Sequence, residues 1–434
     1  METKLDKSSR ISLSKALSKL LRHTGVSQGL PIQADGCCAI APLLVKLKAT
    51  EENIRQIVAE DEKKRYSLIE KDGVLYIRAN SGHSIDQIAP ETFLKIVKSP
   101  AEVGSKRVVH STRSEVLHLI LENGLNRMSR NHIHFYLAET SDDPSANDEF
   151  LTKPSLNGTD VFIELDLDLA MKNGYKFFVQ ENYLLCPGVF DVIPPLYFKN
   201  VYRKIDKKLS LIFSNKDLGV LLDRYQPKFL FVLDFEANCV KGERLEPAEI
   251  VEFPVVPISA KSNTILDKQI FHQYVNPTVH SLQPFTTELC GITLEMLKGA
   301  KSLDSVLNDF ENFLKSNQFS PDEFVFVTCG DFDLRGCLKR EAKFKNMDVK
   351  PYLKRYINLK EVFEIGLLGR GVNNGSKTFQ TDTSMEDMLE KLGLKLDGRH
   401  HSGIDDSKNL AKIVIDLLAK GIFFTNNYVK VVKY

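Results

Sequence analysis

The feature that most constrains the fold is a near-continuous apolar run from Phe229 to Phe235, which contains a single acid. A run of this length predicts a central strand that is buried on both faces of a sheet. Asp234 lies within the run and Glu236 follows two residues later, so both carboxylates point to the same side of that sheet. Phe324 to Thr328 is a second run of the same kind. The second half of the chain is therefore expected to contain a sheet that presents paired acids.

Two further acids stand at the ends of predicted elements. Asp333 follows the strand at 324–328 and can close a site from the start of a helix. Asp406 falls at the first turn of the last predicted helix, around Ser407 to Leu418, where the helix dipole favours a carboxylate. Mg²⁺ requires oxygen ligands of this kind. Such a set of carboxylates is what two-metal cleavage of phosphodiesters needs, and it predicts a nuclease.

A histidine precedes the last of these acids. His401 lies before Asp406 with four residues between them, and it can act as a general base on the attacking water. Its neighbour His400 is the competing candidate for the base, with a surface or substrate contact as its other interpretation. For Asp406 the alternative is a purely structural role as a helix cap. Asp405 is expected to supply that cap, which favours Asp406 as a metal ligand.

With these residues, the chain from about 227 to 434 resembles the DEDDh family of 3′-5′ exonucleases. The resemblance rests on Asp-Phe-Glu-Ala-Asn-Cys and on Gly-Arg-His-His-Ser-Gly-Ile-Asp-Asp-Ser-Lys-Asn, which are similar to the histone-mRNA and RNA-interference-enhancer subgroup. It implies an RNase H-like mixed sheet, action on the 3′ ends of structured or small RNAs, and release of nucleoside 5′-monophosphates. It also implies two Mg²⁺ ions and a base, held or supplied by Asp234, Glu236, Asp333, Asp406 and His401.

The first half of the chain is patterned differently. Helical periodicity at 12–21 and 51–61 is followed by two strand-like runs joined through Asp72-Gly73, a hairpin signal. Helices followed by such a hairpin suggest a small winged-helix lobe. From Arg107 to Tyr202 short strands surround one predicted helix, 113–123. We therefore expect a winged-helix lobe at 1–100, a second lobe at 101–205, a linker at 206–226 and a nuclease domain at 227–434.

Three arginines lie at the ends of predicted elements in this half. Arg22, with His23 beside it, ends a helix; Arg78 ends a strand; Arg130 precedes a strand. A single arginine is more often a solvated surface residue. However, a rigid scaffold delivers side chains to a cleft from the ends of its elements. A guanidinium group binds phosphate oxygens bidentately and stays charged at any working pH. The three arginines are therefore candidates for binding phosphate groups in a cleft.

These residues resemble the RNA 2′-phosphotransferase family over about 10–203. The motifs are Ser14-Lys15-x-Leu17-Ser18-x-x-Leu21-Arg22-His23, Lys64-Arg65-Tyr66, Ile77-Arg78-Ala79-Asn80-x-Gly82-His83-Ser84, His110-x-Thr112 and Arg130-x-His132-Ile133-His134. The resemblance implies that NAD binds between a winged-helix lobe and an ADP-ribosyltransferase-like lobe. It implies a catalytic centre of Arg22, His23, Arg78 and Arg130, and an NAD pocket at His83, Ser84, His110, Ser111 and Thr112.

The reaction implied by this resemblance removes the splice-junction 2′-phosphate of transfer RNA. The 2′-phosphate attacks the nicotinamide ribose carbon and expels nicotinamide. A ribose hydroxyl then attacks the phosphate, which leaves a 2′-OH RNA and ADP-ribose 1″,2″-cyclic phosphate. Charge that builds on phosphorus in the second step can be stabilised by the arginines. Ser111 departs from the family pattern, which usually has glycine there, and a side chain at this position can crowd the dinucleotide.

Composition bounds the setting of both halves. The formal net charge is +1, so RNA must be bound through local basic clusters and not through bulk charge. No apolar run approaches the roughly 20 residues that span a bilayer, and the first ten residues lack the apolar segment of a secretory signal. The seven cysteines contain no Cys-x-x-Cys pair for zinc. These observations predict no membrane association and a cytoplasmic or nuclear location.

Together the two halves predict a bifunctional RNA-processing enzyme, an NAD-dependent RNA 2′-phosphotransferase fused to a Mg²⁺-dependent 3′-5′ exoribonuclease. The main alternative is an exoribonuclease whose first half is a non-catalytic RNA-binding module. The presence of all four positions Arg22, His23, Arg78 and Arg130 argues against it, because mere binding needs charge but not these placements. The sequence does not determine the oligomeric state.

Overall fold

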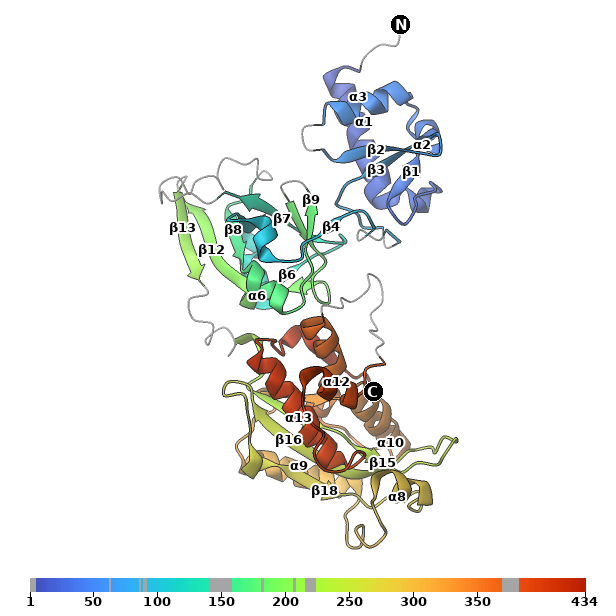
Figure 1. Cartoon of the computed structure of the whole chain (residues 1–434), viewed down its shortest axis with the longest axis vertical. Coiled ribbons are helices and arrows are strands. Elements are labelled where there is room, and N and C mark those ends of the chain that lie inside the picture. Colours follow the sequence, from blue (N-terminus) through green and yellow to red (C-terminus); the bar gives the residue numbers. More distant parts are fainter. Residues whose placement is uncertain are drawn as a thin grey trace. The chain divides into compact units, whose positions relative to one another are not determined.

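The computed structural model describes residues 5–61, 64–85, 87–88, 92–139, 158–180, 183–205, 208–214, 224–368 and 382–434 (Figure 1). The chain divides into two compact units. The first covers most of the chain up to Ser214, and the second covers most of it from Asn215 to Tyr434. Both units combine helices with sheets, so the expected mixture of α/β and α+β structure is confirmed.

The first part of unit 1 packs three helices against a three-stranded sheet. The turn of its hairpin lies at Asp72 and Gly73, whose φ angles of 53° and 74° are in the left-handed region that a type I′ turn requires. The expected hairpin is therefore confirmed. The sheet has the order β1-β3-β2, and the elements are α1 (Lys7–Lys19), η1 (Leu20–Thr24), η2 (Val26–Gln28), β1 (Cys37–Ala39), α2 (Ile40–Leu47), α3 (Glu51–Ala59), β2 (Tyr66–Lys71) and β3 (Val74–Ala79).

Local signals place these helices. The Asp6 side chain accepts a hydrogen bond from the Ser9 N–H at the start of α1, and Thr50 and Asn53 form a capping box at the start of α3. The apolar stripe of α1 then packs with α3 and the sheet into one core, which includes Leu17, Leu21, Ile54 and Ile77. The helix η1 continues α1, so the core holds the segment that carries Arg22 and His23 in place.

The second part of unit 1 is built on one antiparallel sheet with the order β13-β12-β8-β5-β7-β10-β9-β4, beside a two-stranded sheet of β6 and β11. β13 lies within the segment expected to be a linker, yet it pairs with β12; residues 215–223 of that segment lie outside the described residues. The elements are β4 (Lys95–Ile96), η4 (Pro100–Val103), β5 (Arg107–Thr112), α4 (Ser114–Asn123), β6 (Leu125–Asn126), β7 (Ile133–Ala138), β8 (Val161–Leu165), α6 (Leu167–Lys172), β9 (Phe178–Gln180), β10 (Tyr183–Cys186), β11 (Val192–Ile193), η6 (Pro195–Tyr197), β12 (Phe198–Ile205) and β13 (Lys208–Ser214).

Unit 2 is built on a mixed sheet with the order β15-β16-β14-β19-β20-β21. The two apolar runs form β14 and β19, which pair in parallel with Leu233 opposite Thr328. Both strands therefore end at the same edge of the sheet. The strands are β14 (Phe229–Leu233), β15 (Glu236–Ala237), β16 (Ile250–Ser259), β17 (Thr264–Ile265), β18 (Phe271–Tyr274), β19 (Phe324–Thr328), β20 (Arg355–Asn358) and β21 (Val429–Val431).

Helices cover this sheet, and α13 (Gly403–Ala419) lies against β16 and β14 (Figure 1). Aromatic side chains fill the core; the rings of Phe231 and Phe324, for example, stack with centroids 4.1 Å apart. The helices are η7 (Asp267–Gln269), α8 (Pro284–Cys290), α9 (Leu303–Ser316), η8 (Phe332–Leu338), α10 (Lys339–Phe344), η9 (Pro351–Lys354), α11 (Leu359–Val362), η10 (Phe363–Leu367), α12 (Met385–Leu392), α13 (Gly403–Ala419) and η11 (Asn426–Tyr428).

Helix α13 begins earlier than its apolar periodicity indicates. Its first residue is Gly403, and Ser402 occupies the N-cap position without a side-chain hydrogen bond. The expectation that Asp405 caps this helix is wrong, because its carboxylate instead accepts the backbone N–H of Arg399 at 2.9 Å. Asp406 still lies in the first turn, so its proximity to the positive end of the helix dipole is retained.

In the part of the chain that the structure describes, no helix has both the length and the apolar character that crossing a membrane would require.

Candidate functional site

Three acids meet at the edge of the sheet in unit 2. Asp234 follows β14, Glu236 begins β15, and Asp406 comes from the first turn of α13. Each offers a carboxylate oxygen, and these oxygens all lie within 4.8 Å of one another. The two acids that follow β14 and the late acid of α13, far apart in the sequence, are therefore brought together, although the single strand expected through Asp234 and Glu236 is interrupted between β14 and β15. We call these three residues and Asp333 the carboxylate site.

Asp333 joins this group from the helix that follows β19. It is buried in η8, and its Oδ1 accepts the backbone N–H of Phe235 at 2.8 Å. The parallel pairing of β14 with β19 explains this contact, because the chain leaves both strands at the same edge. Asp333 is not one of the three residues whose oxygens cluster most tightly, but its charge raises the pKa of Asp234.

Burial raises the pKa of every member of the carboxylate site, and repulsion from other members adds to this effect at Asp234 and Glu236. Burial raises the pKa of Asp234 well above its usual range, with the charges of Asp333 and Glu236 adding to the effect. For Glu236, burial and the nearby Glu252 raise the pKa to about 9. The pKa of Asp333 and that of Asp406 each rise to about 6, chiefly through burial. A site that holds so many acids out of water favours protons or a cation.

The free oxygens show where a cation can bind. Asp406 Oδ2 accepts the backbone N–H of His401 at 2.8 Å, whereas its Oδ1 is buried and has no hydrogen-bond partner among the described residues. A buried carboxylate oxygen without a partner is costly unless a ligand satisfies it. The donor set consists of carboxylates, which suits a hard divalent ion such as Mg²⁺.

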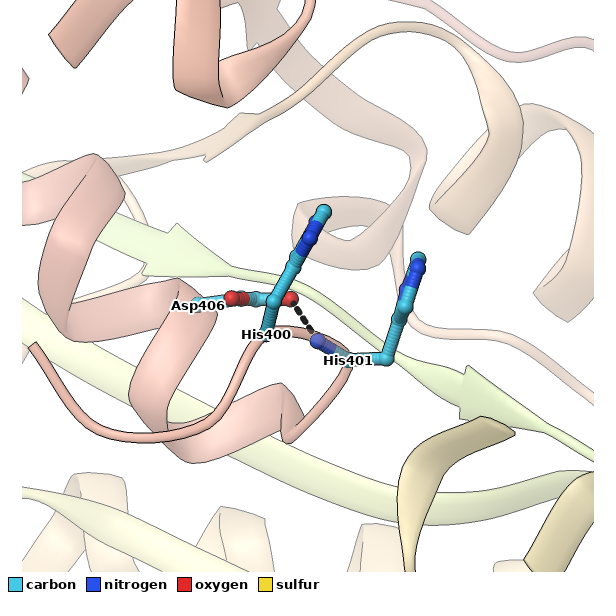
Figure 2. Close-up of side chains that lie close together, drawn as sticks. All are labelled: His400, His401 and Asp406. Atoms are coloured by element: carbon cyan, nitrogen blue, oxygen red, sulfur yellow. Dashed lines mark hydrogen bonds between the residues drawn. The ribbon is translucent and has the colours of Figure 1, made fainter. Parts of the chain in front are cut away.

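Two histidine rings stand beside Asp406 (Figure 2). His400 and His401 stack face to face with centroids 4.0 Å apart, and each offers a ring nitrogen within 4.8 Å of the Asp406 carboxylate. His401 adopts a left-handed φ of 63°, which turns the chain so that its own N–H reaches that carboxylate. Burial and His400 lower the pKa of His401, so it is neutral at physiological pH. His400 Nδ1 lies 3.3 Å from Glu386 of α12.

A fifth acid, Glu252, was not identified from the sequence. It lies on β16 directly opposite Glu236 and is only 2% exposed. Its carboxylate accepts the N–H groups of Gly403 at 3.0 Å and Ile404 at 3.1 Å, and lies 2.8 Å from His272 Nε2. Glu252 thus holds the start of the helix that carries Asp406. Its signal in the sequence is that it is the single charge in the apolar run Ile250–Ser259.

The basic residues of unit 1 also lie together. His23 Nδ1 and the Ser84 hydroxyl are 2.9 Å apart. A Cβ added at Gly82 would lie 3.5 Å from the Arg22 guanidinium, and one at Gly36 would lie 3.3 Å from Arg78 and 3.6 Å from His83 Nε2. The loop glycines therefore leave room for these side chains, and Arg22, His23, Arg78, His83 and Ser84 line one region. We call them, with Arg130, the arginine site.

Positive charge is concentrated at this site. Burial, together with Arg65 and Arg130, lowers the pKa of Arg22, and burial beside Arg22 lowers the pKa of His83 to about 3. The buried Nε atoms of Arg22 and Arg78 have no hydrogen-bond partner among the described residues. Arg130 is exposed, but its charge acts on Arg22 and His23. An anion such as phosphate fits these donors.

The residues expected to contact NAD on β5 have neighbours other than those of the arginine site. His110 Nδ1 is 2.9 Å from the carbonyl oxygen of His134, while Ser111 and Thr112 are partly exposed at the end of the strand. Burial lowers the pKa of His110 and of His134, and the charge of Arg130 adds to the effect, so Arg130 acts on this part of the sheet as well as on Arg22. His132 and His134 were part of a sequence motif but had no assigned role. Burial lowers their pKa values to about 4 and about 3, respectively.

The class that unit 2 defines is a divalent-metal-dependent nuclease, because buried acids, an unpartnered carboxylate oxygen and a neutral histidine meet in one site. The rat protein 3′-5′ exoribonuclease 1 is 32% identical over 277 residues, which cover 61% of this chain and 74% of that protein. The chain belongs to this family of 3′-5′ exoribonucleases. Residues 231–414 match the family described as Exonuclease.

Other relatives match one half each. Bovine ERI1 exoribonuclease 3 is 38% identical over 199 residues, which are 45% of this chain and 55% of that protein, so the chain spans about half the length of this relative. Residues 8–188 match the RNA 2′-phosphotransferase, Tpt1 / KptA family. A putative tRNA 2′-phosphotransferase of Schizosaccharomyces pombe is 35% identical over 196 residues, 44% of this chain and 51% of that protein.

One solved structure of this kind is the nuclease domain of 3′hExo, a DEDDh family member, bound to rAMP. It is 31% identical, with a TM-score of 0.41, and the match covers 46% of this chain and 96% of that chain.

Proposed function

We propose that this protein is a bifunctional RNA-processing enzyme, a 3′-5′ exoribonuclease in its second half and an NAD-dependent RNA 2′-phosphotransferase in its first. The observation that carries the nuclease is the carboxylate site, where Asp406 Oδ1 is buried beside two further clustered acids and has no hydrogen-bond partner among the residues that the structure describes. Domains at 1–100, 101–205 and 227–434, with winged-helix, ADP-ribosyltransferase-like and RNase H-like folds, belong to this proposal. So do RNA substrates and a cytoplasmic or nuclear location.

In the nuclease, the acids hold the cation and the histidine moves the proton. Asp234, Glu236, Asp333 and Asp406 would hold two Mg²⁺ ions, which when bound stabilise the charge that develops on the phosphate oxygens. His401 has a lowered pKa and lies beside Asp406, so it is in the base form and can accept the proton of the attacking water. His400 Nδ1 lies 3.3 Å from Glu386, and we assign His400 a contact with the substrate.

In the phosphotransferase, the arginine site would bind the 2′-phosphate. The buried Nε donors of Arg22 and Arg78, which have no partner among the described residues, suit phosphate oxygens. Arg130 and His23 add charge and a hydrogen-bonding group beside them. His83, Ser84, His110, Ser111 and Thr112 would contact NAD. Because the nucleophile is already an anion, the site needs no strong base, which agrees with the low pKa of His83.

One experiment tests both activities separately. The full chain is incubated with an RNA that bears a single internal 2′-phosphate, once with Mg²⁺ alone and once with NAD and EDTA. We expect 5′-mononucleotides from the 3′ end in the first reaction, and nicotinamide with a 2′-OH RNA in the second. Nicotinamide that never appears above a reaction without protein would favour the alternative, in which the first half only binds RNA.

A further inference from the structure

The outward face of the helix that follows β19 carries a one-sided set of side chains. η8 runs directly into α10, so that Phe332–Leu338 and Lys339–Phe344 form one continuous segment. Its acids, Asp333 and Glu341, are both buried. The residues that are exposed or half-exposed are aromatic or basic, with one glycine, and we call them the basic face: Phe332, Arg335, Gly336, Lys339, Arg340, Lys343 and Phe344.

The two phenylalanines of the basic face are open to solvent. Phe332 is 51% exposed and Phe344 is 56% exposed. The Arg340 guanidinium carbon lies 6.0 Å from the centroid of the Phe332 ring. A Cβ at Gly336 would lie 3.3 Å from that ring and 3.7 Å from the guanidinium, so the glycine keeps the surface between them low. Flat rings beside cations offer places where bases can stack.

Within the described part of the chain, the cations at the far end of the basic face have no acidic partners. Arg340 and Lys343 pair with no carboxylate among the described residues. Neighbouring cations do: Arg335 lies 3.1 Å from Asp331, and Lys345 lies 2.7 Å from Glu341. In a chain whose formal net charge is +1, free cations gathered on one helix face point to a polyanionic partner.

We infer that the basic face binds the single-stranded part of the RNA that lies upstream of the nucleotide being removed. Phosphates would contact Arg340 and Lys343, and a base would stack on Phe344. The inference rests on the proposed exonuclease, because Asp333 of the carboxylate site lies in the first turn of the same helix. From Phe332 to Phe344 the helix rises roughly 18 Å, at about 1.5 Å per residue. That length accommodates several nucleotides.

The test compares long and short RNA on the full-length chain. A variant with Arg340→Gln and Lys343→Gln should bind a labelled, unstructured RNA of roughly 20 nucleotides about tenfold more weakly, as read by fluorescence anisotropy with Ca²⁺ in place of Mg²⁺. The slope of log Kd against log salt should flatten by about 1.4, or about 0.7 for each lost phosphate contact. Degradation of a trinucleotide with Mg²⁺ should stay within about twofold of wild type, because so short an RNA does not reach these residues.

A matched control removes the same charge elsewhere in unit 2. Lys268 of η7 and Lys315 of α9 are exposed lysines off this face, and the Lys268→Gln, Lys315→Gln variant should bind the long RNA as wild type does. Phe344→Ala should weaken binding about tenfold without changing the salt slope, since stacking carries no charge. Equal affinity of the basic-face variant and the control overturns the inference and leaves the surface to an acidic protein partner. If the wild-type protein does not degrade the trinucleotide, the proposed nuclease is contradicted instead. The anisotropy measurement would still show whether the basic face binds RNA.

Discussion

The carboxylate site of unit 2 and the arginine site of unit 1 use the same physical device with opposite sign. In unit 2, buried acids crowd together and their pKa values rise. In unit 1, buried arginine and histidine side chains crowd together and their pKa values fall. In each site, buried polar atoms have no hydrogen-bond partner within the described part of the chain: an Asp406 oxygen in one and the Arg22 and Arg78 Nε atoms in the other.

The comparison shows that the buried charges of a site indicate the charge of its ligand. Gathering like charges away from water lowers stability unless a ligand of opposite charge is bound. The direction of the pKa shift therefore gives the sign of that ligand: cations for the carboxylate site and phosphate for the arginine site. The expected ligands, Mg²⁺ in one case and the phosphates of RNA and NAD in the other, have these signs.

The largest expected effect is the loss of a metal ligand. Asp406→Asn should lower RNA trimming by about 10³-fold or more, because a bound cation contributes several kcal/mol to the transition state and about 1.4 kcal/mol corresponds to a factor of ten. Nicotinamide release should be unchanged. Asp416→Asn is the matched control, since Asp416 lies on the same helix but pairs with Lys420 at 2.6 Å. Trimming by Asp406→Asn at wild-type rate would remove this residue from the site.

The second prediction concerns the two stacked histidines. His401→Ala should slow trimming by roughly 10²–10⁴-fold, the usual effect of losing a general base, whereas His400→Ala should be much milder. Single-turnover trimming rates of the two variants, measured at saturating RNA, make the comparison. If His400→Ala is the inactive variant, the base has been assigned to the wrong ring.

For the arginine site the expected effect is somewhat smaller. Arg78→Ala should lower 2′-phosphate removal by about 10²–10³-fold, as for the loss of one preorganised donor to a developing oxyanion. Arg78→Lys should recover little, because an ammonium group cannot reproduce the planar fork. Arg55→Ala serves as the control, because the Arg55 side chain is exposed on α3. Near wild-type turnover of the lysine variant would show that charge alone suffices.

The fourth prediction is that Glu252 positions Asp406 in the carboxylate site. Glu252→Gln keeps the shape but weakens acceptance of the Gly403 and Ile404 N–H groups, so Asp406 is held less firmly. We expect a 10–100-fold higher Mg²⁺ concentration at half-maximal trimming, typical of outer-shell partners, with kcat at saturating Mg²⁺ changed less. A fall in kcat with an unchanged Mg²⁺ requirement would contradict a positioning role.

The smallest expected effect is on stability, which should depend on pH in opposite directions in the two units. Without metal, acids whose folded pKa is raised bind more protons in the folded state, so unit 2 should lose stability as pH rises from about 4 toward 9. In unit 1 the buried histidines have folded pKa values near 3 to 4. Stability should therefore be lost there as pH falls below about 6.5.

Hydrogen exchange at pH 5 and pH 8, corrected for intrinsic rates, can follow the two units separately. Unit 2 should be better protected at pH 5 and unit 1 at pH 8, and Mg²⁺ should protect unit 2 chiefly at the higher pH. The Asp406→Asn variant should show a weaker pH effect in unit 2. If protection changes with pH in the same direction in both units, the idea that the two sites bury opposite charges with opposite effects on stability is wrong.

The amino-acid sequence by itself determined the parts of each site that depend on local geometry. The two-residue spacing of Asp234 and Glu236 predicted that their carboxylates lie close together, and they do, although Asp234 follows β14 and Glu236 begins β15. Asp406 falls in the first turn of a helix wherever that helix lies. The Asp72-Gly73 turn is likewise local, because only these residue types accept its backbone angles readily. Strand and helix periodicity and turn geometry depend only on residues a few positions apart, so they can be predicted from the sequence.

Only the tertiary structure decided which distant residues support those acids. Glu252 caps α13 across about 150 positions of sequence, and Asp333 is held by Phe235 through the pairing of β14 with β19. The earlier start of α13, the role of Asp405 and the one-sided exposure of Arg340 and Phe344 also follow from packing. The physical reason is that strand register and burial are properties of the assembled sheet, which no local pattern of residues contains.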